Sequence, residues 1–140
     1  MRQQTTYRKA PAQMQKQPIP NESSEQQALF RWADFMTGRH PELALLYHTP
    51  NGGSRSKAEA GRFKAEGVKS GVPDICLPVA RAGYHGLYIE LKRQRDSKTS
   101  ASQKKWIADL QEQGYRAEVC EGWESASQVI LAYIDGGINA

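Results

Sequence analysis

One segment of six residues, Leu-Tyr-Ile-Glu-Leu-Lys at positions 87–92, constrains the fold of this chain more than any other. Aliphatic residues alternate there with other types, which is the pattern of a β-strand that packs one face on a core. Tyr88, Glu90 and Lys92 therefore share the second face. An acid and a base two residues apart on a strand project into the same space, so the sequence predicts a sheet that carries a charged pair.

A second strand, predicted over residues 74–79, brings another acid towards this pair. Its aliphatic residues alternate with Asp74 and Cys76, so a hairpin between the two strands lets Asp74 approach Glu90. Two carboxylates held close together repel each other unless a cation lies between them, and their hard oxygen atoms suit Mg²⁺ or Mn²⁺. Lys92, beside such a cation, would position and polarise an attacking water or stabilise the charge of a pentacovalent phosphate.

The other elements follow from helical periodicity and from turn residues. Asn21, Ser23 or Ser24 can cap a first helix that ends near Gly38. The predicted order is this first helix, a strand over 43–49, a helix over 56–66, strands over 74–79 and 87–92, a helix over 100–113, a strand over 116–120 and a helix over 125–134. This order predicts a single α/β domain over residues 21–140, with a central mixed β-sheet flanked by helices.

The net charge of +4 is carried by the first twenty residues. They hold four basic residues and no acid, and their Gln- and Pro-rich composition predicts a disordered basic arm over 1–20. The remaining chain balances 15 basic against 15 acidic residues. Two local segments, 51–70 and 92–105, are basic, and the chain after position 105 is acidic. This distribution fits one face that meets phosphate groups, and an ordinary mixed surface gives the same counts.

Several classes of protein are disfavoured by the sequence. It has no run of about 18 apolar residues and no apolar signal region, so we expect a cytoplasmic protein that does not use a membrane. Cys76 and Cys120 lie in apolar, strand-like segments and are expected to be buried thiols rather than zinc ligands. The histidines at positions 40, 48 and 85 have no second histidine at ligand spacing, so a histidine-metal nuclease is not expected.

Four short motifs follow one another along the chain. They are Pro50-Asn51-Gly52-Gly53-x-Arg55, Gly67-x-x-x-Gly71-x-Pro73-Asp74, Gly86-x-x-x-Glu90-x-Lys92 and Ser100-x-x-Gln103. Their order and spacing, over roughly residues 22–120, resemble the virus-type replication-repair nuclease (VRR-NUC) family. The pair Pro73-Asp74 followed by Glu90-Leu91-Lys92 also resembles the motif of the PD-(D/E)xK nuclease superfamily. Small stand-alone members of the family occur in bacteriophages, and this chain is similar to those.

The resemblance implies a restriction-endonuclease-like core and a metal-dependent endodeoxyribonuclease, which hydrolyses phosphodiester bonds. The implied substrate is branched DNA, such as four-way (Holliday) junctions or flaps, in a cell infected by a phage and in the context of DNA repair. Symmetric cleavage of both strands of a junction needs two active sites, so we expect a homodimer.

The resemblance also implies a role for individual residues. Asp74, Glu90 and the backbone carbonyl of Leu91 would be ligands of Mg²⁺ or Mn²⁺, and Lys92 would be the catalytic lysine. Gln103 would orient water or phosphate.

An acid on the first helix would complete the site. Glu22 matches the family spacing better, and Glu25 is the alternative, because both residues lie on the core-facing stripe of that helix. The residues expected to contact DNA are His48, Asn51, Gly52, Arg55, Lys57, Arg93 and Lys98.

Simpler interpretations remain open for the less specific residues. Glu22, Glu25 and Gln103 could belong to helix caps, which often contain such residues, and Asn51-Gly52 could be only a turn. A DNA-binding or assembly module that keeps the fold without the chemistry is a second hypothesis. A nuclease that acts on RNA or on plain duplex ends is a third.

Overall fold

The structure is a computed structural model that describes residues 18–50, 56–95 and 97–136. The predicted basic arm lies outside the described residues up to position 17. Three of the predicted DNA contacts, Asn51, Gly52 and Arg55, also lie outside the described residues. Within the described ranges, no helix is both long enough and apolar enough to cross a membrane.

Apart from the 3₁₀ helix η1, the order of elements matches the order predicted from the sequence. It is α1 (Glu22–Met36), the 3₁₀ helix η1 (Pro41–Leu45), β1 (Tyr47–His48), α2 (Lys57–Ala65), β2 (Ile75–Leu77), β3 (Leu87–Lys92), α3 (Ala101–Glu112), β4 (Arg116–Glu121) and α4 (Trp123–Ile134).

The four described strands form one sheet in the order β1-β2-β3-β4. β2 is antiparallel to both β1 and β3, whereas β4 is parallel to β3. The predicted mixed sheet is therefore confirmed.

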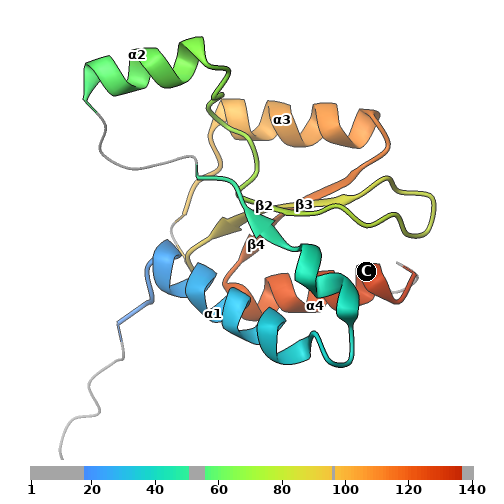
Figure 1. The fold of residues 1–140 in the computed structure, drawn as a ribbon. Helices are drawn as coiled ribbons and strands as arrows, with labels where there is room; N and C mark the ends of the chain where they lie inside the picture. Colours follow the sequence, from blue (N-terminus) through green and yellow to red (C-terminus); the bar gives the residue numbers. More distant parts are fainter. Residues whose placement is uncertain (1–17, 51–55, 96, 137–140) are drawn as a thin grey trace, which may run out of the picture.

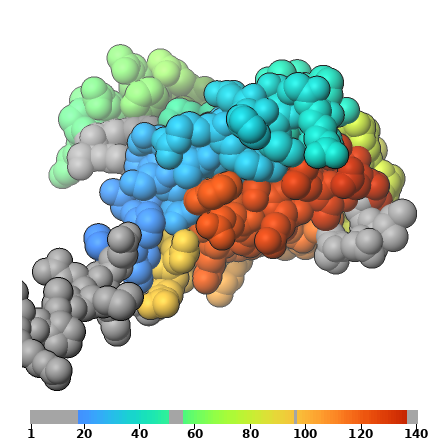
Figure 2. Space-filling view, turned by 90° about the horizontal axis from the view of Figure 1, so that it is seen from below, coloured from blue at the N-terminus to red at the C-terminus, as the bar shows by residue number. Residues whose placement is uncertain are grey.

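Helices cover the two faces of the sheet unequally (Figure 1). α3 lies over one face, and α1 and α4 lie over the other, where they run side by side across the surface seen in Figure 2. The aliphatic residues of β3 point into this second layer and are buried against Leu29 of α1 and Ile130 of α4. Full burial of each such side chain stabilises the fold by about 1.5–3 kcal/mol.

Local sequence explains where most helices begin and end. The side chain of Asn21 accepts a hydrogen bond from the Ser24 N–H at the start of α1, and Ser56 caps α2 in the same way. Gly67, with a φ of 94°, follows α2 in the left-handed region that glycine tolerates best. Cys76 and Cys120 are buried free thiols, as predicted.

Three predicted boundaries were wrong. The segment 43–49 is not one strand, because Pro41 starts the short helix η1 and only Tyr47–His48 pairs with β2. The strand predicted over 74–79 is shorter, Ile75–Leu77. The last helix begins at Trp123 rather than at residue 125, because its first turn is capped from another part of the chain, as described below.

Candidate active site

The register of the β2–β3 hairpin places the two predicted acids opposite each other. Ile75 pairs with Ile89 and Cys76 pairs with Tyr88. Extending this register by one residue sets Asp74 opposite Glu90, on the face of the sheet that α3 covers. Strand alternation also puts Lys92 on this face.

Asp74 is held at the end of its strand by hydrogen bonds on both its backbone and its side chain. Its carbonyl accepts from the Thr49 N–H at 2.7 Å and from the His48 ring N–H at 3.0 Å. Its carboxylate Oδ2 accepts from the Leu91 N–H at 3.1 Å. The side chain is therefore fixed towards β3 before any ligand binds.

Pro73 explains why the Leu91 backbone is accessible at this point. The hairpin register, extended by two residues, sets Pro73 opposite Leu91. Proline has no N–H, so it cannot donate the ladder hydrogen bond to the Leu91 carbonyl. The N–H of Leu91 turns to the Asp74 carboxylate instead. The carbonyl of a strand residue points to the same side as its N–H, which leaves the Leu91 carbonyl directed towards Asp74.

Glu90, Lys92 and Gln103 form one hydrogen-bonded group. The Lys92 ammonium lies 3.0 Å from Gln103 Oε1 and 3.3 Å from Glu90 Oε1. The Gln103 amide donates to Glu90 Oε1 at 2.8 Å, and its own oxygen accepts from the Ser100 N–H at 2.9 Å. Gln103 therefore caps α3 and also orients the lysine and the glutamate, so the cap interpretation and the site interpretation both describe it.

Burial and charge change the protonation of the two acids. Burial raises the pKa of Glu90 to about 7, and the adjacent Asp74 carboxylate acts in the same direction against the opposing effect of Lys92. Burial also raises the pKa of Asp74, partly opposed by the hydrogen bond from the Leu91 N–H. Paired carboxylates whose charge is disfavoured in this way are a frequent feature of functional sites.

These residues line one pocket of about 140 Å³. Its walls are Glu22, Gly71, Val72, Asp74, Glu90, Lys92 and Gln103. Gly71 allows this close packing, because a Cβ there would lie 2.8 Å from the backbone and side chain of Ser102 at the start of α3. The pocket thus brings together residues from four segments that are far apart in the sequence.

The structure separates the two candidate acids of the first helix. Glu22 is exposed and lines the pocket, and its charge contributes to the raised pKa of Asp74. Glu25 is buried elsewhere, where its Oε2 accepts from the Trp123 N–H at 2.6 Å and its Oε1 accepts from the Gln94 amide at 3.2 Å. The contact with the Trp123 N–H caps the first turn of α4. The geometry therefore favours Glu22 over Glu25 for the site.

The donor set suits a hard divalent cation. Glu90 Oε2 is buried and has no hydrogen-bond partner among the described residues, and Glu90 lines the same pocket as Asp74. A cation would neutralise both carboxylates and satisfy this oxygen. Among the residues that the structure describes, no three acidic, histidine or cysteine side chains form a preassembled cluster, so the set consists of Asp74 and Glu90 with the Leu91 carbonyl nearby and Glu22 at the rim.

The comparisons with known proteins agree with this geometry. The family model described as "VRR-NUC domain" matches residues 13–124. The chain belongs to the VRR-NUC family. A solved structure titled "VRR_NUC domain protein" is 32% identical, with a TM-score of 0.73, and the match covers 84% of this chain and 91% of that chain. No curated protein sequence matches the chain.

Membership in the VRR-NUC family makes this a nuclease domain and confirms the expected restriction-endonuclease-like fold class. The described pocket is the part of this VRR-NUC domain in which acids and a lysine meet. All four motifs of the sequence lie within the matched residues.

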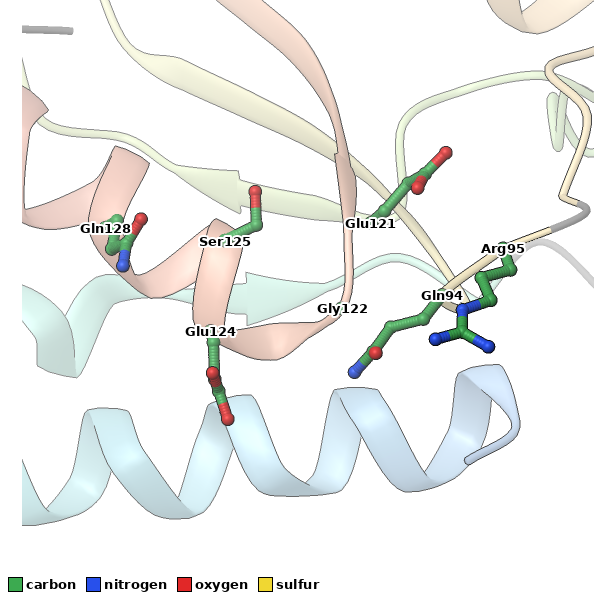
Figure 3. Close-up of a pocket in the computed structure, with 7 residues that line it drawn as sticks. All are labelled: Gln94, Arg95, Glu121, Gly122, Glu124, Ser125 and Gln128. Carbon is green, nitrogen blue, oxygen red and sulfur yellow. The ribbon is translucent and has the colours of Figure 1, made fainter. Parts of the chain in front are cut away.

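A second and larger pocket, of about 410 Å³, lies at the N-terminus of α4. Figure 3 shows Gln94 and Arg95 reaching it from the segment after β3, Glu121 from the end of β4, and the remaining lining side chains from α4. One arginine and two glutamates are among its lining residues, and the helix end is already capped by Glu25. It does not have the paired, partly unsatisfied carboxylates of the first pocket, so size alone does not identify the site.

The described DNA-contact candidates of the VRR-NUC domain do not form one cluster. Lys57 starts α2, a helix whose side chains are exposed apart from Phe63, and Arg93 and Lys98 are exposed on the segment after β3. His48 lies beside Asp74. Sequence reasoning missed the role of Glu25, whose only signal was an acid on the same helical stripe as Leu29, and its partner is 98 residues away.

Proposed function

We propose that this VRR-NUC domain is a metal-dependent DNA endonuclease that hydrolyses phosphodiester bonds with Mg²⁺ or Mn²⁺. One observation carries the proposal: Glu90, whose buried Oε2 has no hydrogen-bond partner among the described residues, lines one pocket together with Asp74 and Lys92. Such an arrangement would destabilise a purely structural core, because an unsatisfied buried carboxylate is costly. In this proposal, Asp74, Glu90 and Lys92 are the charged residues of a PD-(D/E)xK motif.

The ligands in this proposal are Asp74, Glu90 and the Leu91 carbonyl, with Glu22 completing the set. When bound there, the cation supplies Lewis-acid stabilisation of charge on the phosphate. The carboxylates hold their position through contacts that exist without it, because Leu91 N–H fixes Asp74 and Gln103 fixes Glu90.

Lys92 acts on the reacting phosphate group in this proposal. Lys92 is 7% exposed as a residue and its ammonium is held by Gln103 and Glu90, so little side-chain entropy is lost when it engages substrate. It would donate a hydrogen bond to a phosphate oxygen or to the attacking water, where negative charge develops. Gln103 is a positioning residue that orients this lysine.

The preferred substrate in this proposal is branched DNA, such as four-way junctions or flaps. Glu22 is exposed at the edge of the pocket, and Lys57, Arg93 and Lys98 are exposed elsewhere on the described surface. A single domain of this size contacts little duplex, and symmetric cleavage of a junction needs two copies. The exposed Phe35, at 86% accessibility on α1, supplies an apolar side chain for an interface between copies.

Cleavage assays test the chemistry directly. Labelled four-way junction, flap, duplex and single-stranded DNA would be incubated with Mg²⁺, with Mn²⁺ or with a chelator. We expect wild-type protein to cut branched DNA with either metal, and Lys92→Met and Glu90→Gln to lose cleavage. Equal cutting by these variants would disprove the site, and binding without any cutting by wild type would favour the inactive DNA-binding module.

Two matched controls keep the test specific. Lys105→Met removes an exposed lysine of α3 that pairs with Asp109 at 2.6 Å. Glu42→Gln removes a glutamate that also has a buried oxygen without a partner but that lies beside Arg81 rather than a second acid. We expect both variants to cut like wild type.

The dimer is tested separately. Sedimentation with and without junction DNA should show a two-copy species, and Phe35→Ser should shift it towards monomer. A protein that stays monomeric at working concentration in both conditions would rule out the dimer while leaving the chemistry unaffected.

A further inference from the structure

Two tyrosines form a row on the sheet, next to the acids and on the same face. Tyr47 of β1 pairs with Cys76 of β2, which pairs with Tyr88 of β3. These positions alternate with the core-facing residues, so both rings lie on the side of Asp74 and Glu90. We name Tyr47 and Tyr88 the tyrosine row. The candidate catalytic chemistry described above does not use it.

The tyrosine row directly adjoins the acids. Cys76 and Tyr88 are each two residues from Asp74 and Glu90, respectively, which is about 7 Å along a strand. Tyr47 is also the diagonal cross-strand neighbour of Asp74, a spacing of about 7–8 Å that aromatic side chains can span. The tyrosine row therefore lies within about one nucleotide's length of a phosphate held at the acids.

The row is open to solvent on the side of β1. Tyr47 is 47% exposed on an edge strand of the sheet, and α3 packs on β4 rather than on β1. Tyr88 is half-buried and supported from behind by Tyr115, with ring centroids 5.3 Å apart at an interplanar angle of 75°. His85 stacks in turn on the edge of Tyr115 at 5.7 Å. A supported aromatic ring loses little freedom when another ring stacks on it.

Both phenols remain neutral. Hydrogen bonding with the Cys76 side chain is the main cause of the raised pKa of Tyr47, whereas burial is the main cause for Tyr88 and raises its pKa to about 12. The hydroxyls therefore add no negative charge beside a phosphate.

We propose that the tyrosine row binds an unpaired nucleobase adjacent to the scissile phosphate, with Tyr47 as the stacking side chain. This inference rests on the proposed function and narrows its substrate to DNA with unpaired nucleotides at the cut, such as a flap or an open junction. A base inside a duplex is stacked on its neighbours and does not offer its face. Stacking on one aromatic residue accounts for about a 5- to 150-fold difference in affinity and does not depend strongly on base identity.

Binding measurements test the inference without requiring cleavage. In a Lys92→Met background with Mg²⁺, flap DNA and fully paired duplex of the same length would be titrated by fluorescence anisotropy. A 2-aminopurine base would be placed at each unpaired position in turn, because its fluorescence falls when it stacks. We expect quenching next to the cut. We expect Tyr47→Ala to weaken flap binding about 5- to 150-fold and leave duplex binding unchanged.

The controls separate stacking from a general loss of fold or charge. Tyr47→Phe and Tyr47→Trp should keep flap affinity, because the ring rather than the hydroxyl makes the contact. Tyr84→Ala removes an equally exposed tyrosine at the turn of the hairpin, at its opposite end from the acids, and should have no effect.

Two results would overturn the inference. One is equal loss of flap and duplex binding in Tyr47→Ala, and the other is unchanged binding with unchanged 2-aminopurine fluorescence. Absence of any DNA binding by the Lys92→Met protein also overturns it. If wild type never cuts but the flap preference still depends on Tyr47, the proposed nuclease function fails and this inference stands.

Discussion

Two glutamates are buried in this domain to almost the same degree, and their surroundings differ in one respect. Glu25 is 1% exposed and Glu90 is 3% exposed. Glu25 accepts hydrogen bonds on both oxygens, from the Trp123 N–H and from Gln94. Glu90 Oε1 accepts a hydrogen bond from the Gln103 amide and pairs with the Lys92 ammonium, whereas Glu90 Oε2 has no hydrogen-bond partner among the described residues.

The difference separates a structural acid from a candidate catalytic one. At Glu25 the protein itself satisfies the charge, so the contact stabilises the junction of α1 and α4. At Glu90 the protein leaves part of the charge unsatisfied beside a second carboxylate, and the pKa rises to about 7. Burial of an acid is therefore a weaker indication of function than incomplete satisfaction of that acid.

The largest effect is expected from Glu90→Gln on cleavage. Loss of one charged ligand should reduce the single-turnover rate on branched DNA by about 10³-fold or more. Circular dichroism would check that the fold is retained. If Glu25→Gln lost activity as strongly without losing stability, the two acids would not differ in role as we describe.

The second-largest effect is expected on the stability of the fold, from substitution of Glu25. Glu25→Ala leaves the part-buried Trp123 N–H and the Gln94 amide without their acceptor, which should lower the free energy of unfolding by about 2 kcal/mol. Urea denaturation measures it. Glu25→Gln retains one acceptor oxygen and should lower stability less, and a loss of equal size would show that the cap hydrogen bond is not the stabilising contact.

A pH series without divalent cations should reveal the protonation of Glu90 as a change in the free energy of unfolding. The pKa of Glu90 is raised from 4.5 to about 7, so the folded state holds this proton more tightly than the unfolded state. The resulting stabilisation is complete below pH 4.5 and is lost as pH rises towards 7, on the order of 2 kcal/mol. Glu90→Gln should flatten this slope, and an unchanged slope would assign the proton to another group.

The smallest effect is the response of stability to added metal. At pH 7.5, Mg²⁺ or Mn²⁺ at ten times its dissociation constant should increase the free energy of unfolding by about 1.4 kcal/mol. Thermal unfolding with and without a chelator measures the increase. It should disappear in Glu90→Gln and persist in Glu42→Gln, and persistence in both variants would locate the metal elsewhere.

The sequence predicted the strand-borne part of the site because strand alternation and pairing are local rules. Glu90 and Lys92 share a face by periodicity, and the hairpin register brings Asp74 to them. Gln103 was expected at the site from the family resemblance and in a helix cap from its position, and it makes both contacts.

The parts that escaped prediction depend on contacts between distant segments. The start of α4 was placed two residues late because its cap is Glu25, on a different helix. The segment 43–49 read as one apolar run, and no local signal distinguished a 3₁₀ turn at Pro41 from a strand. The choice between Glu22 and Glu25 was open for the same reason, since both occupy one stripe of α1.

The bond between Glu25 and Trp123 has a consequence for synthesis of the chain. Glu22 lies one helical turn from Glu25, and α1 is fastened at that turn by a residue made 98 positions later. As the ribosome extends the chain, α1 and the hairpin emerge long before α4 does. The turn that carries the rim acid of the pocket is therefore stabilised by a contact that cannot form until Trp123 has been synthesised.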